Sequence, residues 1–183
     1  KNIILVSKNM EKDLDYYLEM IRQFLIKRYD YVANQPCSTN PLAFTQGGLY
    51  RGVKKETDKI GYDIVESFTA SFGITALNEL NVLMTGKPLH VSDRREVNKV
   101  MDYILLKLEQ FKKEDGYLYA SYYVPAESLC GTQVKQFRDM FGVIEGVSDR
   151  EYFSNGMHCH VSADITPFEK QDAEEELFHK GYG

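Results

Sequence analysis

The chain has 183 residues, 43% of them hydrophobic, which is enough to bury one core, and its composition gives no reason to divide it. We therefore expect a single domain over residues 1–183. The net charge of −5, with acidic and basic residues interspersed, argues against binding to nucleic acid, and no apolar run is long enough for a membrane span.

The first third of the chain predicts one long helix. Residues 3–6 are too few to distinguish a short buried strand from the flank of a helix. Residues 11–33 keep one apolar face at helical spacing, which predicts a helix of about six turns. Pro36 and Pro41 then hold the chain extended or turned, and we expect a short strand at residues 42–44.

Residues 63–86 predict a strand, a turn and a helix in succession. Residues 63–73 favour a strand, and the apolar residues of 74–86 recur at helical intervals. Gly73 stands at the junction, where we expect the turn. Gly86 is a typical helix end.

A second unit of the same kind follows. Asp93 and Glu96 predict a capping box at the start of a long amphipathic helix. The run at 117–124 is aromatic and β-prone, and it should end at Pro125, which cannot donate to a sheet ladder. Pro125 also has a φ angle suited to the first turn of a helix, and Gly142 would end that helix.

The element order β, α, α, β, α predicts an α/β fold with strands side by side and helices outside. It does not distinguish a closed barrel from an open sheet. Residues 143–153 are expected to form a loop and 157–161 a strand. The acidic run at 172–176 is typical of a solvated helix face.

The start of the helix after Pro125 is the candidate binding site. Backbone N–H groups at the positive end of a helix dipole bind phosphate or carboxylate without a basic side chain. The alternative is that Glu127 and Ser128 only cap the helix. The candidate binding residues are Pro125, Ala126, Glu127, Ser128 and Leu129.

Other candidates each have a structural alternative. His158 and His160 would share one face of a strand and could supply half of a metal site, but no third ligand is evident, which favours partly buried, hydrogen-bonded histidines. Cys130 would lie in a first helical turn, where the dipole lowers a thiol pKa, unless it is a small core residue. Glu127 could orient a substrate hydroxyl or carry a proton.

Cysteine usage favours a cytoplasmic location. Cys37, Cys130 and Cys159 are odd in number and include no C-x-x-C pair, which suits a reducing compartment better than a disulfide framework. The chain begins at Lys1 without an initiator methionine, and we interpret it as a piece of a longer protein.

Six stretches together resemble the catalytic subunit of anaerobic (class III) ribonucleoside-triphosphate reductase, a family of glycyl-radical enzymes. They follow the order of that family at similar spacings over about three quarters of the chain. They are SFGITALNE (71–79), LMTGK (83–87), YYVPAESLC (122–130), FGVIEGVSDR (141–150), YFSNGMH (152–158) and ITPFEK (165–170).

The resemblance implies part of a ten-stranded α/β barrel made of two five-stranded parallel halves. In the family, a loop with a radical glycine and a thiyl-forming cysteine meet inside that barrel. Neither is found here, because Cys37 lacks the Gly-Cys-Arg setting and no glycine has the Cys/Ser-Gly-Tyr setting. The zinc-binding cysteine cluster of the family is also absent. No catalytic residue and no metal site is therefore assigned, and the isolated piece is expected to be inactive.

The resemblance also implies a function for the intact protein. A thiyl radical would abstract the ribose 3′-hydrogen of a ribonucleoside triphosphate, with formate as the reductant, and the turn at 125–129 would hold the substrate phosphates. The implied partners are an iron–sulfur radical-SAM activating enzyme and a second subunit of a homodimer. The residues expected to line the active site, with no role assigned, are Asn78, Glu79, Cys130 and His158. The segment at 157–160 departs from the Ser-Phe-His-Val type usual in the family.

Two other interpretations stay open. The chain could belong to a glycyl-radical enzyme of the formate-lyase type, which has no need of a triphosphate-binding turn. It could also be a stand-alone nucleotide-binding or interaction module without catalytic activity.

Overall fold

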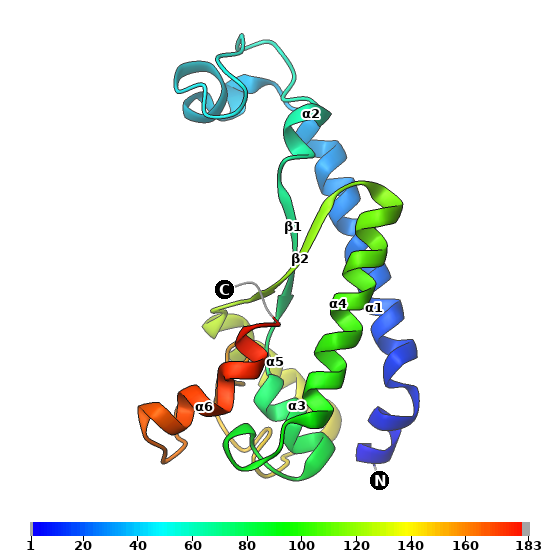
Figure 1. Ribbon diagram of the computed structural model, residues 1–183, viewed down its shortest axis with the longest axis vertical. Helices are drawn as coiled ribbons and strands as arrows, with labels where there is room; N and C mark the ends of the chain where they lie inside the picture. Colours follow the sequence, from blue (N-terminus) through cyan, green and yellow to red (C-terminus); the bar gives the residue numbers. More distant parts are fainter. Residues whose placement is uncertain (1, 181–183) are drawn as a thin grey trace. The chain divides into compact units, whose positions relative to one another are not determined.

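The computed structural model describes residues 2–180, which divide into two compact units (Figure 1). The larger unit is built from Ser71–Leu108, the chain after Tyr119 and the first turns of helix α1 (Asn2–Ala33). The smaller unit is built from Asp13–Ala70 and Glu109–Tyr119. The expectation of a single domain stays a prediction.

The long N-terminal helix is confirmed, and it begins at Asn2, so residues 3–6 are helical and not a strand. The strand expected at 42–44 is wrong: after the short helix η1 (Cys37–Thr39), the chain forms the π-helix η2 (Leu42–Gln46). The reason lies at Pro41, whose backbone is already helical (φ −58°, ψ −40°) and starts the turn.

An ion-paired cluster joins two helices of the smaller unit. The Arg22 guanidinium contacts both carboxylate oxygens of Asp115, at 2.7 and 2.5 Å, and lies 4.5 Å from the centre of the Phe111 ring. Arg22 holds the pKa of the Asp115 carboxyl below its usual range. Since the Arg22 side chain is only 13% exposed, this pair fixes α1 against the end of α4 (Arg95–Asp115).

The strands β1 (Thr69–Ile74) and β2 (Leu118–Tyr123) form a two-stranded parallel sheet (Figure 1). The second strand lies where the sequence predicts it. The first is shorter than expected, because Tyr62–Val65 forms the helical turn α2 after Gly61. Gly73 lies inside β1 and not at a turn. A Cβ there would meet Val124 Cγ2 at 2.7 Å, so glycine allows β1 to approach the segment that follows β2.

The larger unit adds α3 (Leu77–Thr85), η3 (Leu89–Val91), α5 (Glu127–Phe141) and α6 (Pro167–Phe178). The predicted helix ends at Gly86 and Gly142 are both confirmed. Pro125 lies before α5 and not in its first turn. In place of a capping box, Asp93 accepts the Arg95 N–H at 3.2 Å. Glu96 instead pairs with a lysine one turn later.

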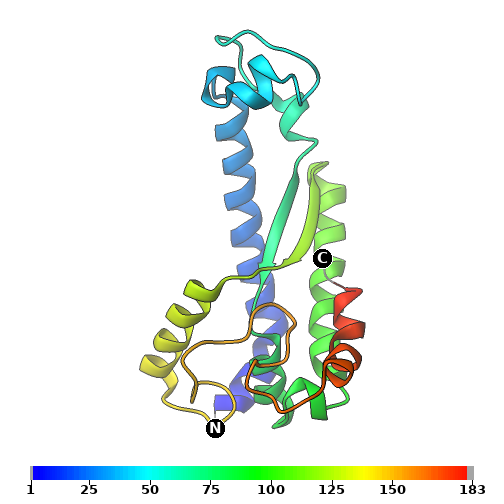
Figure 2. The same cartoon turned by 90° about the vertical axis from the view of Figure 1, so that its left-hand side faces the viewer.

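Residues 143–166 run irregularly from α5 to α6 (yellow to orange in Figure 2). The expected loop at 143–153 is confirmed, but the strand at 157–161 is wrong, because these residues form turns and irregular backbone. The acidic face of α6 is also not wholly solvated, since Glu174 is only 7% exposed. The observed fold is mixed α/β with a small parallel sheet.

Of the helices in residues 2–180, none combines the length and the apolar character that crossing a bilayer requires.

Candidate functional site

Within residues 2–180, the backbone N–H groups of residues 127–129 in the first turn of α5 have no hydrogen-bond acceptor. Strand β2 ends at Tyr123, and Ala126 is the N-cap residue with a non-helical backbone (φ −120°, ψ 56°). Ala126 makes no side-chain capping hydrogen bond, and within residues 2–180 neither the Glu127 nor the Ser128 side chain accepts a first-turn N–H. The amides of residues 127–129 are therefore available to an anion.

The amide of Ala126 is not available, which corrects part of the predicted site. Its N–H donates to Asn155 Oδ1 at 3.0 Å. The same oxygen accepts the Cys130 thiol at 3.3 Å, and Asn155 Nδ2 donates to Glu127 Oε1 at 3.4 Å. Asn155 thus fixes the start of α5 from another segment. Sequence reasoning missed it, although an Asn-Gly pair marks a turn where such a contact can form.

Two cavities adjoin the start of α5. The first, here called the α5 cavity, has a volume of about 500 Å³ and is lined by residues 122–125, Glu127, Asn155, Gly156 and His158. The second, the His160 cavity, has a volume of about 400 Å³ and is lined by Glu127, residues 152–155, residues 158–161 and Lys170. Pro125 and Glu127 therefore face the α5 cavity, whereas the side chains of Ser128 and Leu129 are exposed.

Cys130 is a core residue and not an activated thiol. It is fully buried and packs in a cluster with Val134, Val147 and Phe153. Burial raises the pKa of the Cys130 thiol, and the nearby carboxylates of Glu79 and Glu127 add to this. The expected lowering of the pKa by the helix dipole is therefore wrong, because desolvation outweighs it.

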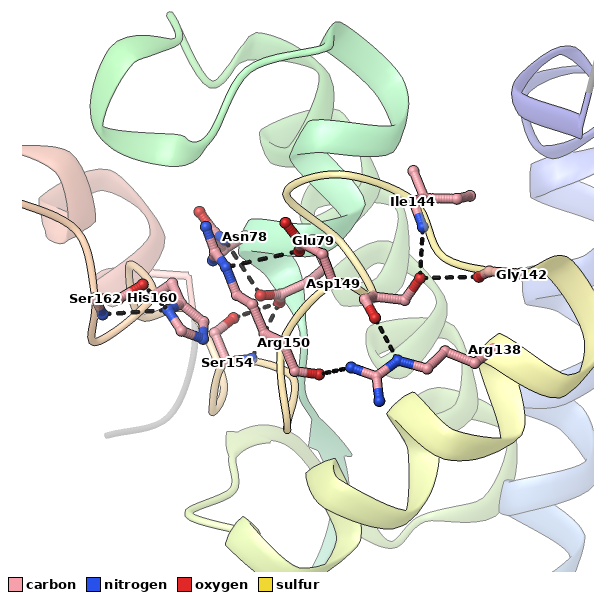
Figure 3. Close-up of polar contacts among 11 residues, drawn as sticks. Asn78, Glu79, Arg138, Gly142, Ile144, Asp149, Arg150, Ser154, His160 and Ser162 are labelled. Carbon is pink, nitrogen blue, oxygen red and sulfur yellow. Dashed lines mark hydrogen bonds and ion pairs between the residues drawn. The ribbon is translucent and has the colours of Figure 1, made fainter.

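Asn78 and Glu79 are buried and line neither cavity. Glu79 Oε2 accepts the Ser154 hydroxyl at 2.6 Å and the Ser154 N–H at 3.2 Å, as Figure 3 shows. Asn78 Nδ2 donates to Glu79 Oε1 at 3.3 Å, and Asn78 Oδ1 accepts the Leu89 N–H at 3.2 Å. These two residues position the segment that lines the cavities.

The two histidines of the His-x-His motif both line the His160 cavity but differ in burial, and the backbone between them is not a strand. The His158 side chain is 48% exposed, whereas the His160 residue is 8% exposed. His160 Nδ1 contacts Ser162 Oγ at 2.7 Å (Figure 3). The His160 ring also stacks on Tyr152 with centroids 5.7 Å apart. Burial, with help from the Arg150 charge, lowers the pKa of His160. Within the described residues, no group of three or more His, Cys, Asp or Glu side chains could hold a metal ion.

His158 belongs to both cavities and is held from α6. Its Nδ1 lies 2.9 Å from Glu174 Oε2, and Lys170 Nζ lies 2.5 Å from the same oxygen. Glu174 Oε1 accepts the Cys159 N–H at 2.8 Å. Burial raises the pKa of Glu174, but the hydrogen bonds from His158, Lys170 and Cys159 outweigh it and hold the pKa below its usual range.

A family model for anaerobic ribonucleoside-triphosphate reductase matches residues 4–183. The chain belongs to this family. The resemblance of the six sequence stretches is thereby confirmed, and the family match does not support a formate-lyase type of enzyme.

Curated members of the reductase family align over most of the chain. The anaerobic ribonucleoside-triphosphate reductase of Haemophilus influenzae is 28% identical over 181 residues, which is 94% of this chain and 25% of the relative. The Escherichia coli relative of that name is 28% identical over 170 residues (89% and 23%), and that of phage T4 is 27% identical over 158 residues (84% and 24%). The chain spans about a quarter of the length of these relatives.

Proposed function

We propose that the intact protein carrying this chain reduces ribonucleoside triphosphates to 2′-deoxyribonucleoside triphosphates by radical chemistry. The start of α5 would bind the phosphates of the substrate. Family membership supports the reaction, since the curated relatives are named for it. The main structural support for the binding site is the uncapped first turn of α5 beside the α5 cavity.

The arrangement suits a triphosphate in size and in polarity. Three amides, those of residues 127–129, stand at the positive end of a 15-residue helix. The adjoining α5 cavity measures about 500 Å³, within the range typical of small-molecule sites. Glu127 adds a negative charge at the mouth, which opposes a bare anion. The amides therefore have to supply most of the attraction.

The rest of the reaction belongs to other parts of the intact protein. A glycyl radical there would supply the hydrogen-atom abstraction that begins the reduction, and formate would be the reductant. An iron–sulfur radical-SAM enzyme would generate the radical in a homodimeric, cytoplasmic protein. The residues of this chain would bind and orient the substrate, with Asn155 and Glu79 holding the cavity walls in place. The ten-stranded barrel is part of the same proposal.

Replacing Glu127 by proline tests the binding site in the intact protein. Proline is accepted at the first helical position, where Ala126 before it is already non-helical, and it removes one amide donor. The control is Glu127→Gln, which removes the same charge but keeps the amide. We expect tripolyphosphate and ATP to bind roughly tenfold more weakly to Glu127→Pro than to Glu127→Gln, since charge-assisted hydrogen bonds contribute about 1.5–3 kcal/mol.

The control variant has an expected result of its own. Glu127→Gln should bind tripolyphosphate slightly more tightly than the wild type, because a like charge has been removed. Equal affinities in Glu127→Pro and Glu127→Gln, measured by titration calorimetry, would exclude the amide site. Replacing Ala126 by proline is not a suitable test, because its amide already donates to Asn155.

A further inference from the structure

His158, which lines both cavities, is paired with Glu174, which lines neither of them. The Glu174 carboxylate is ionised and can only accept, so the His158 nitrogen 2.9 Å away from it carries a proton. A lone pair on Nδ1 would instead face a carboxylate oxygen, which is repulsive. Nδ1 thus stays protonated whether the ring is neutral or charged. The atom that gains or loses a proton is Nε2.

The Nε2 atom of His158 is the ring nitrogen that does not contact Glu174, and the ring lines both cavities. It has no hydrogen-bond partner within residues 2–180, and the side chain is 48% exposed. The His158 ring lines the α5 cavity together with Pro125 and Glu127. A phosphate bound at the first turn of α5 would therefore adjoin a cavity lined by the His158 imidazole, and the contact with Glu174 fixes the orientation of that ring.

We propose that His158 takes up a proton at Nε2 when a phosphate group binds at the start of α5, with Glu174 as the residue that positions it. This inference rests on the proposed function of that site. Solvent supplies the proton, an N–H bond forms at Nε2, and the new N–H donates to a phosphate oxygen. The resulting imidazolium lies between two anions, the carboxylate of Glu174 and the bound phosphate.

The surrounding charges favour this role. From α6, Glu174 attracts the imidazolium, while Lys170 opposes it with Nζ 3.4 Å from Nδ1 and already paired to Glu174. From α5, the Glu127 carboxylate lines the same cavity. Tyr122 and Tyr123 of β2 also line that cavity, and Tyr123 is engaged by its hydroxyl with the Leu177 carbonyl at 2.6 Å. Two carboxylates therefore outnumber one ammonium group, and the bound phosphate adds further negative charge, which favours a cationic ring.

The test measures proton uptake in the intact protein with inorganic tripolyphosphate as the probe. Calorimetric titrations at pH 6 and pH 8, in buffers of different ionisation enthalpy, give the number of protons bound with the ligand. We expect wild-type affinity to fall roughly tenfold from pH 6 to pH 8, because a deprotonated Nε2 has no N–H and the charge-assisted hydrogen bond to phosphate is lost. His158→Asn is the decisive variant, because its amide can still donate to Glu174 but has no second nitrogen to titrate.

The variants separate a proton-linked role from a purely structural one. His158→Asn should lose the uptake beyond that of tripolyphosphate itself, and Glu174→Gln should show an intermediate value. A structural role would change stability in these variants and leave the uptake equal to that of the wild type.

The remaining outcomes are distinct. Equal proton uptake in wild type and His158→Asn would overturn the inference while the phosphate site stands. If tripolyphosphate and ATP failed to bind the wild type at either pH, the proposed function itself would fail, and this inference with it.

Discussion

Helices α3 and α5 each follow a strand of the small sheet, yet their first turns are completed differently. At α3, the N–H groups of Ala76 and Leu77 donate to the carbonyl oxygens of Ser154 and Gly156, at 3.0 and 3.1 Å. At α5, the described residues 2–180 offer a partner to the Ala126 amide alone, and that partner is a side chain, Asn155. Backbone carbonyl groups thus cover two amides at the start of α3, here called the closed junction. The start of α5, here called the open junction, adjoins a cavity.

The same segment completes both junctions. Residues 152–162, here called the bridging loop, supply the carbonyl groups at α3 and the amide side chain at α5. Buried Glu79 fixes the loop at Ser154, and Glu174 fixes it at Cys159. Which strand–helix junction keeps uncovered amides therefore depends on contacts from this loop. The sequence of the junction alone does not decide it.

The largest effect is expected from opening the closed junction. Glu79→Ala leaves the buried N–H and hydroxyl of Ser154 without an acceptor, which costs on the order of 3 kcal/mol locally. Amide exchange of the peptides containing Ala76 and Ser154, measured in the intact protein, should become roughly 100-fold faster. Glu79→Gln should lie between this variant and the wild type, because it keeps one carbonyl acceptor. Unchanged exchange in Glu79→Ala would show that the loop does not depend on this carboxylate.

A smaller effect is expected from freeing the last paired amide of the open junction. Asn155→Ala removes the acceptor of the Ala126 N–H and of the Cys130 thiol, at a cost of about 1–2 kcal/mol. Exchange at the start of α5 should speed up by roughly tenfold, while exchange at the start of α3 stays as in the wild type. Asn155→Asp keeps the acceptor and serves as the control. Equal acceleration at both helices would mean that the two junctions are not separately fixed.

The smallest effect is expected from pH. Burial holds the pKa of His160 below the ordinary value of about 6.5, so the unfolded chain takes up a proton more readily than the folded chain does. The stability that the neutral ring contributes is present above about pH 6.5 and is lost as the pH falls further. The apparent Tm of the intact protein should therefore drop between pH 7.5 and 5.5 by a degree or two more in the wild type than in His160→Gln. A drop of equal size in both proteins would assign the pH dependence to other groups.

Features set by neighbouring residues could be predicted from the sequence. The aromatic run of β2 and the glycines that end α3 and α5 depend on local propensity, and they lie where expected. The errors arise where distant contacts decide. Residues 157–161 have a strand-like composition, but Glu174 takes the Cys159 N–H that a ladder would need. Nothing local distinguishes that outcome from a strand.

The candidate site shows the same division between local and distant signals. The start of α5 is recognisable from its strand–proline–helix pattern. The role of Asn155 is not recognisable, because Ala126, whose N–H it accepts, lies 29 positions earlier. The positioning roles of Glu79 and Glu174 likewise follow only from the fold, since an acidic residue in a helix is most often solvated.

Gly156 gives these arrangements a geometric origin. Its backbone adopts φ +50°, and a Cβ at this position would lie 2.7 Å from the Cβ of Tyr123. Its carbonyl meanwhile accepts the N–H of Leu77. A methyl group at this position would clash with Tyr123 and force the bridging loop away from β2. The same displacement would break the hydrogen bond from the Leu77 N–H at the start of α3. Because Gly156 has no side chain, the bridging loop can contact the end of β2 and the start of α3 at the same residue.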